Sequence, residues 1–250
     1  MNTLANRVAL VTGGAGGIGS AVCAELAAQG AAVVVGYRNS REPAEALVRR
    51  LPRSPLPHAA LRAPVTDSAA LGELAAEVER RYGRCDILVN CAGTTRFVPH
   101  ARLDELDDAL IDEILATNVR GPFAAVRALY PLMRRGGDAV VVNISSIAAF
   151  TAMGSNVMYC ASKAALDNMT KSLARALAPE VRVVSVSPGL VDTEFIRKLD
   201  KTWRDEQAAR TPLKRLATPQ DIARTVAAVA ASLTFATGVI IPIDGGRPLG

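Results

Sequence analysis

The stretch Val8-Ala9-Leu10-Val11-Thr12-Gly13-Gly14-Ala15-Gly16-Gly17-Ile18-Gly19 decides the fold of this 250-residue chain. A short apolar run of strand type leads into a glycine-rich turn, and an Ala- and Leu-rich helical pattern follows at once. Glycines at such a turn let the backbone bend tightly, approach a pyrophosphate and pack helix against strand. The helix N-terminus then offers free N–H groups and a partial positive charge to the phosphates. The stretch therefore predicts a βα unit that binds a dinucleotide.

Two glycine patterns fit this turn equally well. Gly14, Gly16 and Gly19 match G-x-G-x-x-G, whereas Gly13, Gly17 and Gly19 match T-G-x-x-x-G-x-G. The spacing does not decide between them. A tight turn without a ligand is the alternative to both.

Strand and helix patterns alternate along the rest of the chain. The strand candidates are Val8–Val11, Ala32–Val35, Ala59–Arg62, Ile87–Asn90, Ala139–Ile144, Val181–Val186 and Val239–Ile241. The helix candidates are Ile18–Gln29, Pro43–Arg50, Ser68–Tyr82, Leu103–Leu132, Val157–Leu177 and Pro219–Ser232. Continuously apolar strands are typical of a parallel sheet with both faces covered. We expect an α/β fold in one domain over residues 1–250: a doubly wound parallel sheet (Rossmann fold) of about seven strands with helices on both faces.

The longest segment outside this alternation runs from Leu190 to Leu216. Long irregular segments at the carboxyl ends of parallel strands usually carry function. We expect a substrate-covering lid near residues 190–216. A surface excursion without a role is the alternative.

Composition excludes several classes of function. The formal net charge is +5, but the basic residues are dispersed and form no continuous stripe with interleaved aromatics, which argues against nucleic-acid binding. The four cysteines show no C-x-x-C spacing, so we expect neither a metal site nor a disulfide framework. The first strand begins within a few residues of Met1, and no apolar run reaches membrane-spanning length. These features predict a cytoplasmic protein with reduced thiols.

A second motif carries acid–base chemistry. Tyr159 and Lys163 stand at positions i and i+4 of a predicted helix, so a phenol and an ammonium share one helix face. A nearby ammonium favours the phenolate and moves the phenol toward useful proton transfer. The preceding strand ends in Asn143-Ile144-Ser145-Ser146, which brings a hydroxyl to the same sheet edge. Such a hydroxyl would polarise a carbonyl for hydride attack.

Taken together, these motifs resemble the short-chain dehydrogenase/reductase family, in its single-domain branch that includes the 3-oxoacyl-[acyl-carrier-protein] reductases. The resemblance covers essentially the whole chain. The matching elements are Thr12–Gly19, Asn90-Cys91-Ala92-Gly93, Asn118 in Thr-Asn-Val-Arg-Gly, Ser146, Tyr159 with Lys163, Pro188-Gly189 with Thr193, and Ile243-Asp244-Gly245-Gly246. Their order and spacing agree with the family throughout.

The resemblance implies a role for each of four catalytic residues. Tyr159 is expected to be the general acid in reduction and the base in oxidation. Lys163 is expected to hold the nicotinamide ribose and to lower the pKa of Tyr159. Ser146 is expected to orient the substrate oxygen, with Ser145 as its rival, and Asn118 to hold a water in the proton relay.

The resemblance also implies a set of cofactor contacts. These are Thr12, Gly13, Ala15, Gly16, Gly17, Ile18, Gly19, Arg38, Val65, Asn90, Ala92, Gly93, Tyr159, Lys163, Pro188, Gly189, Val191 and Thr193. This chain departs from the family at Cys91, which replaces an asparagine, at Pro64, which replaces the usual Asp or Asn beside the adenine, and at Val184. The Pro64 substitution leaves that contact to the backbone of Val65.

Cofactor preference depends on the end of the second strand. NAD enzymes place an acidic residue there, and its carboxylate repels a 2′-phosphate. This chain has Tyr37 at that position, followed by Arg38, whose guanidinium suits a phosphate. We therefore expect NADP(H) rather than NAD(H), with Arg38 as a solvated loop residue the alternative.

The expected function is an oxidoreductase that transfers a hydride between NADP(H) and a carbonyl or secondary alcohol, most naturally on a medium-sized ketone or 3-oxoacyl compound. A dehydratase or epimerase on the same scaffold and a non-enzymatic NADP(H)-sensing protein are the alternatives. Substrate contacts are expected from Thr94–Val98, Ile147–Val157 and Leu190–Lys201. Small apolar residues on several helix faces favour association, and the resemblance implies a homotetramer. Arg134 and Arg135 would suit an acyl-carrier partner, and helix-end solvation explains them equally well.

Overall fold

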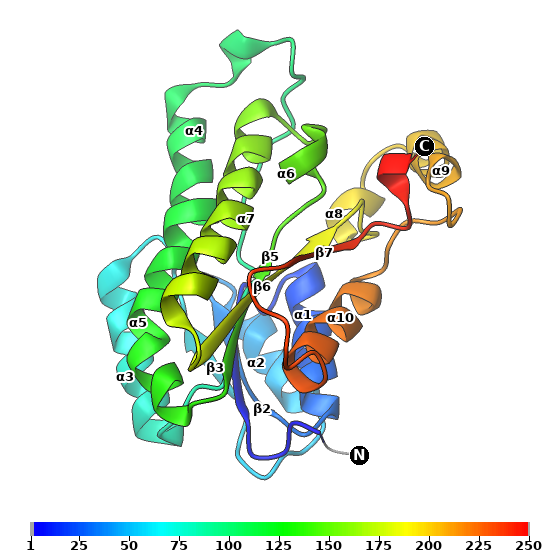
Figure 1. Ribbon diagram of the computed structural model, residues 1–250. Helices are drawn as coiled ribbons and strands as arrows, with labels where there is room; N and C mark the ends of the chain where they lie inside the picture. Colours follow the sequence, from blue (N-terminus) through cyan, green and yellow to red (C-terminus); the bar gives the residue numbers. More distant parts are fainter. Residues whose placement is uncertain (1–2, 250) are drawn as a thin grey trace.

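Seven strands form a single parallel sheet at the centre of the computed structural model, which describes residues 3–249 (Figure 1). Their bounds are β1 Val8–Thr12, β2 Ala32–Tyr37, β3 Ala59–Arg62, β4 Ile87–Asn90, β5 Ala139–Ile144, β6 Val181–Pro188 and β7 Ile240–Ile243. The strand order is β3-β2-β1-β4-β5-β6-β7, so the winding reverses between β1 and β4. In such a sheet, ligands bind outside the carboxyl ends of the strands at the point of reversal. The predicted doubly wound fold is confirmed.

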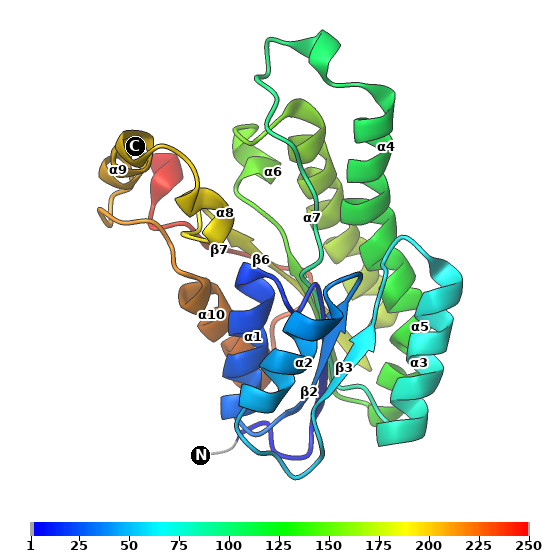
Figure 2. The same ribbon diagram turned by 180° about the vertical axis from the view of Figure 1, so that it is seen from behind.

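Helices cover both faces of this sheet (Figures 1 and 2). The helices are α1 Gly17–Ala28, α2 Arg41–Arg50, α3 Ser68–Tyr82, α4 Asp108–Leu115, α5 Gly121–Gly136, α6 Ala148–Thr151, α7 Val157–Leu177, α8 Glu194–Arg197, α9 Lys201–Arg210 and α10 Pro219–Ala231. Short 3₁₀ turns occupy Leu103–Glu105 and Arg247–Leu249, and a π-helical turn spans Ala116–Arg120. One face is covered by α1, α2 and α10, and the other by α3, α5 and α7. None of the helices in residues 3–249 is long and apolar enough to cross a membrane.

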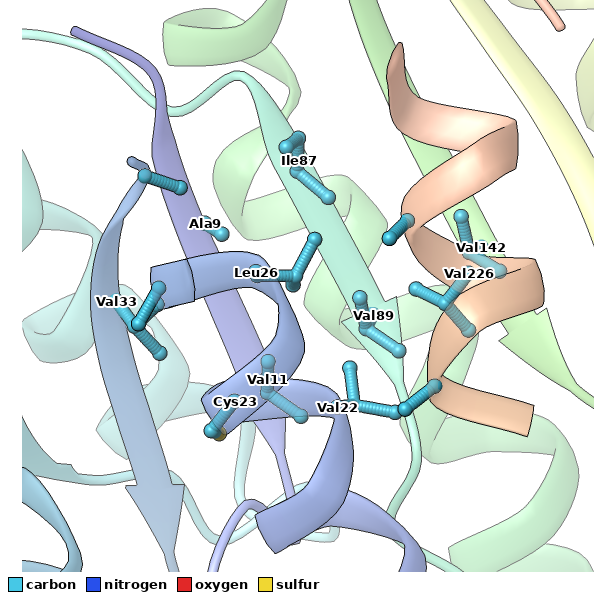
Figure 3. Packing of buried hydrophobic residues seen from close by; sticks show 14 of the residues in the cluster. Ala9, Val11, Val22, Cys23, Leu26, Val33, Ile87, Val89, Val142 and Val226 are labelled. Atoms are coloured by element: carbon cyan, nitrogen blue, oxygen red, sulfur yellow. The ribbon is translucent and has the colours of Figure 1, made fainter. Parts of the chain in front are cut away.

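The core on the α1/α10 face is built from β-branched side chains of the strands and from the apolar stripes of the two helices. Val11 and Val89 point from β1 and β4 toward Val22 of α1 and Val226 of α10, and all four are fully buried (Figure 3). Each such side chain contributes roughly 1.5–3 kcal/mol by leaving water. Because this packing fixes α1 against the sheet, it also fixes the glycine turn at its N-terminus.

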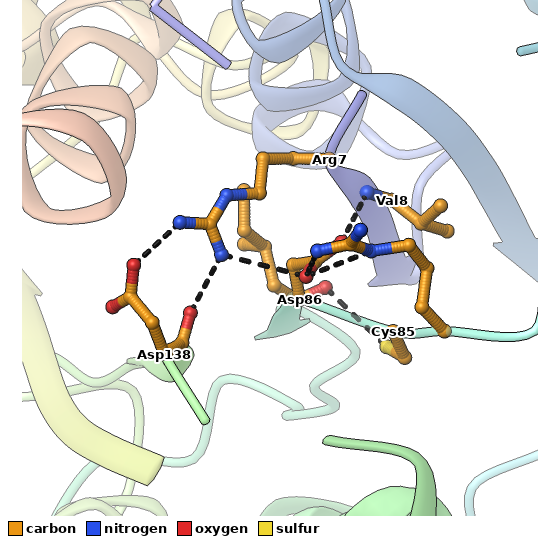
Figure 4. A network of polar contacts seen from close by, with 7 residues as sticks. Arg7, Val8, Cys85, Asp86 and Asp138 are labelled. Atoms are coloured by element: carbon orange, nitrogen blue, oxygen red, sulfur yellow. Dashed lines mark hydrogen bonds and ion pairs between the residues drawn. The ribbon is translucent and has the colours of Figure 1, made fainter. Parts of the chain in front are cut away.

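A buried carboxylate ties the amino ends of the central strands together. Asp86 is 2% exposed, and its oxygens accept from the backbone N–H of Val8 at 2.7 Å and from Arg84 at 2.6 and 2.9 Å (Figure 4). Arg7 reaches Asp86 at 3.4 Å and also the backbone oxygen of Asp138 at 2.8 Å. The cluster therefore links β1, β4 and β5 at their amino ends, and the predicted site lies at the opposite, carboxyl ends of the strands.

Several element ends differ from the sequence prediction by one or two residues, and three segments need comment. The single helix expected over Leu103–Leu132 is a 3₁₀ turn, α4, a π-helical turn and α5, which continues to Gly136. The segment expected to be irregular contains α8 and α9, and α9 is capped by the Asp200 carboxylate on the N–H of Trp203 at 2.8 Å. The last strand runs over Ile240–Ile243 rather than Val239–Ile241, because Pro242 lies on a sheet edge, where no ladder hydrogen bond is lost.

Candidate active site

The glycine turn lies at the carboxyl end of β1, where the chain enters α1. Gly13 has φ +64°, and a Cβ there would lie 2.9 Å from Ala92 Cα. A Cβ on Gly19 would lie 2.2 Å from the backbone oxygen of Gly13. Gly16 caps α1 without a side-chain hydrogen bond, so the N–H groups of the first turn are left for another acceptor. The turn thus fits a phosphate group. A Cβ on Gly14 would lie 2.9 Å from the backbone oxygen of Val11, so the close contacts leave both glycine patterns open.

Thr12 joins this turn to the loop after β4. Its Oγ1 accepts from the N–H groups of Cys91 and Ala92, each at 3.2 Å. The side chain of Asn90 is 2% exposed and donates to Asn143 Oδ1 at 2.9 Å, so it braces β5. The sequence-predicted Thr12, Asn90 and Ala92 are therefore brought together at the reversal of the sheet.

Three predicted catalytic side chains meet where β5 ends beside the first turns of α7. The Ser146 side chain lies beside the Tyr159 phenol and acts to lower the pKa of Tyr159, and its Oγ accepts from the N–H of Ala148 at 3.2 Å. Lys163 Nζ donates to the backbone oxygen of Ile144 at 2.8 Å and lies 5.8 Å from the centroid of the Tyr159 ring. The two serines are separated by their environment: Ser145 is 4% exposed and its Oγ points to the Lys163 carbonyl at 3.5 Å. Ser146, and not its rival, faces the tyrosine.

The acidity of this pair differs from the sequence expectation. Burial raises the pKa of Tyr159, and the hydrogen bond with Ser146 opposes that rise. Burial also lowers the pKa of Lys163 from 10.5 to about 8, opposed by Cys91 and Asp167. The net pKa of Tyr159 is therefore raised and not lowered, because desolvation of the phenol dominates and the Lys163 ammonium donates to the Ile144 carbonyl. The phenol therefore keeps its proton at neutral pH.

Asn118 lies in the π-helical turn between α4 and α5 and is 1% exposed. Its Nδ2 donates to the backbone oxygen of Thr94 at 3.0 Å and to Ser162 Oγ at 3.1 Å, while its Oδ1 accepts from the Thr94 N–H at 2.9 Å. A Cβ on Gly93 would lie 3.5 Å from Asn118 Oδ1 and 3.9 Å from Lys163 Nζ. Asn118 thus clamps the loop after β4 against the helix that carries Tyr159 and Lys163.

The turn after β6 forms the opposite wall of the site. The Pro188 carbonyl accepts from the N–H of Ile147 at 2.9 Å, and Gly189 donates to Ile243 at 3.0 Å. Val191 pairs with Ala217, so the two ends of the predicted lid meet in a β-bridge. Thr193 comes close to the glycine turn, since a Cβ on Gly17 would lie 3.3 Å from its side chain.

The remaining residues predicted to contact the cofactor lie after the carboxyl ends of β1, β2 and β3. Arg38 is exposed directly after β2. Val65 is 6% exposed, and its side chain packs against Gly121, where a Cβ would approach to 2.9 Å. Ala15 and Ile18 are half-buried in the glycine turn and the first turn of α1.

Sequence reasoning missed one residue that shapes the site. Asn156 is 1% exposed and caps α7 by accepting from the Tyr159 N–H at 2.7 Å. Its Nδ2 donates to Arg96 O at 2.8 Å and to Thr95 Oγ1 at 3.2 Å. An asparagine three residues before the tyrosine is a recognisable N-cap signal. Its contact with the loop after β4 is tertiary and leaves no local pattern.

The departures from the family pattern are accommodated in the core. The Cys91 thiol lies near Lys163, and burial raises its pKa to about 12, opposed by the Lys163 charge. Val184 is fully buried in β6. Within residues 3–249, no cluster of three His, Cys, Asp or Glu side chains is arranged to hold a metal ion.

Comparison with known proteins agrees with this geometry. The sequence model of the family described as Enoyl-(Acyl carrier protein) reductase matches residues 13–247. A protein of Streptomyces violaceoruber named as ketoacyl reductase 2 of the granaticin polyketide synthase is 38% identical over 97% of this chain and 96% of its own length. The 3-oxoacyl-[acyl-carrier-protein] reductase FabG of Thermotoga maritima is 34% identical over 97% of this chain and 98% of its own. The crystal structure of a short-chain dehydrogenase/reductase from Brucella melitensis, titled glucose/ribitol dehydrogenase, superposes with a TM-score of 0.90 at 34% identity, covering 98% and 97% of the two chains.

Proposed function

The chain belongs to the short-chain dehydrogenase/reductase family, and we propose that it reduces the ketone of a medium-sized, largely apolar 3-oxoacyl compound with NADP(H). The chain is an oxidoreductase of this family, and its relatives include ketoacyl reductases. The observation that carries the proposal is the meeting of Ser146, Tyr159 and Lys163 at the carboxyl edge of the sheet, beside a glycine turn with free N–H groups.

Proton transfer follows from the environment of these side chains. Because burial raises the pKa of Tyr159, its Oη holds a proton that it can give to a ketone oxygen as negative charge develops there. Ser146 donates to the same oxygen and polarises the carbonyl. When bound, the nicotinamide supplies the hydride. Lys163, with a pKa of about 8, is protonated at neutral pH and stabilises the phenolate left behind.

Asn118 is proposed to hold the water through which Tyr159 and Lys163 are reprotonated. A π-helical turn leaves a backbone carbonyl without its usual partner, and such turns are frequent at functional sites. Asn118 occupies the middle of that turn and contacts Thr94 on the substrate side. The position suits a proton relay that leads away from the reacting atoms.

The apolar rim of the site supports the proposed substrate. Exposed apolar side chains stand on the segments that flank the carboxyl edge of the sheet. They are Phe97, Phe150 and Met153 before and beside α6, and Leu199, Trp203 and Leu213 in the segment that contains α9. An apolar acyl chain would cover this surface, and we propose that the 190–216 segment closes over it as a lid.

We propose NADP(H) as the cofactor, with Arg38 contacting the 2′-phosphate. Arg38 is exposed directly after β2, and the neighbouring Tyr37 carries no charge that would repel a phosphate. The measurement is the ratio of kcat/KM for NADPH and NADH in the wild type and in Arg38→Ala. We expect Arg38→Ala to lower the ratio about tenfold. A preference for NADPH that survives loss of Arg38 would contradict this contact.

Exposed apolar residues also support self-association. Ala161, Ala164 and Ala165 are exposed on α7, and Phe235 and Leu249 are almost fully exposed near the C-terminus. We propose a homotetramer in the cytoplasm, and a monomeric mass by light scattering at micromolar concentration would contradict association. We further propose an acyl-carrier protein as the partner that would deliver a 3-oxoacyl substrate.

The activity itself is tested by following NADPH oxidation with a panel of ketones and 3-oxoacyl thioesters. The proposal predicts turnover that rises with the length of the apolar chain. Tight NADPH binding without turnover of any ketone would instead indicate a cofactor-sensing protein.

A further inference from the structure

The carboxyl ends of β2 and β3 lie side by side next to the glycine turn. Gly14 in the turn donates to the Gly36 carbonyl at 2.8 Å, which ties the turn to β2. On the other side of β2, Tyr37 pairs in register with Arg62, the last residue of β3, and the N–H of Ala63 donates to the Tyr37 carbonyl. Neighbouring strands are about 4.8 Å apart. Arg62 therefore lies one strand away from the end of β2, where the contact to the adenosine 2′ oxygen is proposed.

The pleat of the sheet decides on which face Arg62 lies. Tyr37 on β2 and Ala60 on β3 both pack in the cluster beneath α1 and α2, whereas Leu61 packs in the cluster of the other face. Side chains alternate along a strand, so Arg62 lies on the same face as Ala60. It therefore shares the face of Tyr37 and of the helix that begins at the glycine turn.

Unpaired positive charge gathers at the carboxyl ends of β2 and β3. Arg38 and Arg62 are both exposed, and within residues 3–249 neither forms an ion pair or a side-chain hydrogen bond. The next cation along the chain, Arg41, is paired with Glu45 at 2.7 Å. Within the described residues, two arginines without an ion-paired carboxylate therefore neighbour Tyr37: Arg38 follows it in the chain, and Arg62 is its register partner on β3.

We propose that Arg62 is a second specificity-determining residue for the cofactor, which together with Arg38 recognises the adenosine 2′-phosphate. The inference rests on the proposed use of NADP(H). A phosphate monoester carries between one and two negative charges at pH 7, more than one guanidinium neutralises. The two guanidinium groups of Arg38 and Arg62 together would match that charge, and each planar fork suits phosphate oxygens. The second cation comes from β3 and is far from Arg38 in sequence. A prediction of cofactor preference from the residues at the end of β2 therefore does not include it.

The test is the ratio of the dissociation constants for NAD⁺ and NADP⁺, measured by titration calorimetry on the full chain without any substrate. The variants are Arg62→Ala, Arg38→Ala and the double variant, with Arg53→Ala as the matched control. Arg53 is also exposed and without an ion pair within residues 3–249, but it precedes β3 at the opposite end of that strand. Far-UV circular dichroism verifies that each variant is folded.

We expect Arg62→Ala to reduce the preference for NADP⁺ about tenfold, the double variant to reduce it further, and Arg53→Ala to leave it unchanged. A wild type that prefers NADP⁺ and keeps that preference in Arg62→Ala would overturn the role of Arg62 and leave the proposed cofactor intact. An equal loss in Arg53→Ala would overturn it too, because it would show a general effect of net charge. A wild type that binds both dinucleotides equally would refute both proposals.

Discussion

The buried ammonium of Lys163 should make the stability of this protein depend on pH in a way that one substitution removes. Lys163 is 6% exposed, and its Nζ donates to the Ile144 carbonyl. Burial lowers its pKa from 10.5 to about 8, opposed by Cys91 and Asp167. The perturbation is Lys163→Met, which keeps an unbranched side chain of similar length and removes the amine.

The magnitude follows from the shift in pKa. One pKa unit corresponds to about 1.4 kcal/mol, so the shift of Lys163 corresponds to about 3 kcal/mol. Between pH 8 and pH 10.5 the unfolded chain holds a proton that the folded chain has released. The free energy of unfolding of the wild type should therefore rise with pH in this window, relative to a chain without the amine. Below pH 8 the full cost of burying the ammonium is present.

The assay is denaturant unfolding of the wild type and Lys163→Met, monitored by circular dichroism across this range of pH. Burial raises the pKa of Cys23 and of Cys85 in the folded chain, and these thiols are common to both proteins, so their contributions cancel in the difference. We expect the stability of the variant relative to the wild type to fall by about 3 kcal/mol between pH 8 and pH 10.5. A difference that stays constant over this window would refute the reasoning.

Two further predictions concern the amino end of the sheet and the choice between the serines. Asp86→Ala should destabilise the protein by about 1–3 kcal/mol, because the Val8 N–H loses a buried acceptor while the partly exposed Arg84 can be hydrated; chemical unfolding measures this, and an unchanged free energy of unfolding would contradict it. Ser146→Ala should lower kcat by roughly a hundredfold or more, because it removes a donor to the substrate oxygen. Ser145→Ala should lower kcat far less, since Ser145 Oγ faces the Lys163 carbonyl, and equal losses in steady-state assays would contradict the assignment.

The strands and the main helices were predictable because their patterns are local. The glycine turn after an apolar strand predicts the βα unit. The strand predicted at Ala59–Arg62 has the same bounds in the structure. The break at Ala116–Arg120 was not predictable, because a π-helical turn adds a residue without ending the apolar stripe on either side. Helix α9 was missed for a different reason: most of its residues are exposed and its buried residue, Gln207, is polar, so no apolar periodicity marks it.

The candidate site likewise has features that local sequence patterns predict and features that depend on tertiary structure. The spacing predicted that Ser146, Tyr159 and Lys163 lie near one another, because only the short helix α6 separates β5 from α7. The pKa of Tyr159 could not be predicted from its spacing to Lys163, since its direction depends on burial by the tertiary structure. The same holds for Asn156, whose contacts with Thr95 and Arg96 join segments about 60 residues apart.

The central claim is that Tyr159 donates the proton in a hydride-transfer reaction. Its most direct test is Tyr159→Phe, assayed for NADPH oxidation with the best ketone of the panel and for NADPH binding by titration. The substitution keeps the ring and removes only the donor, so we expect turnover to fall by at least roughly a thousandfold while the dissociation constant for NADPH stays within a few-fold of wild type. Turnover within about tenfold of wild type would contradict the claim.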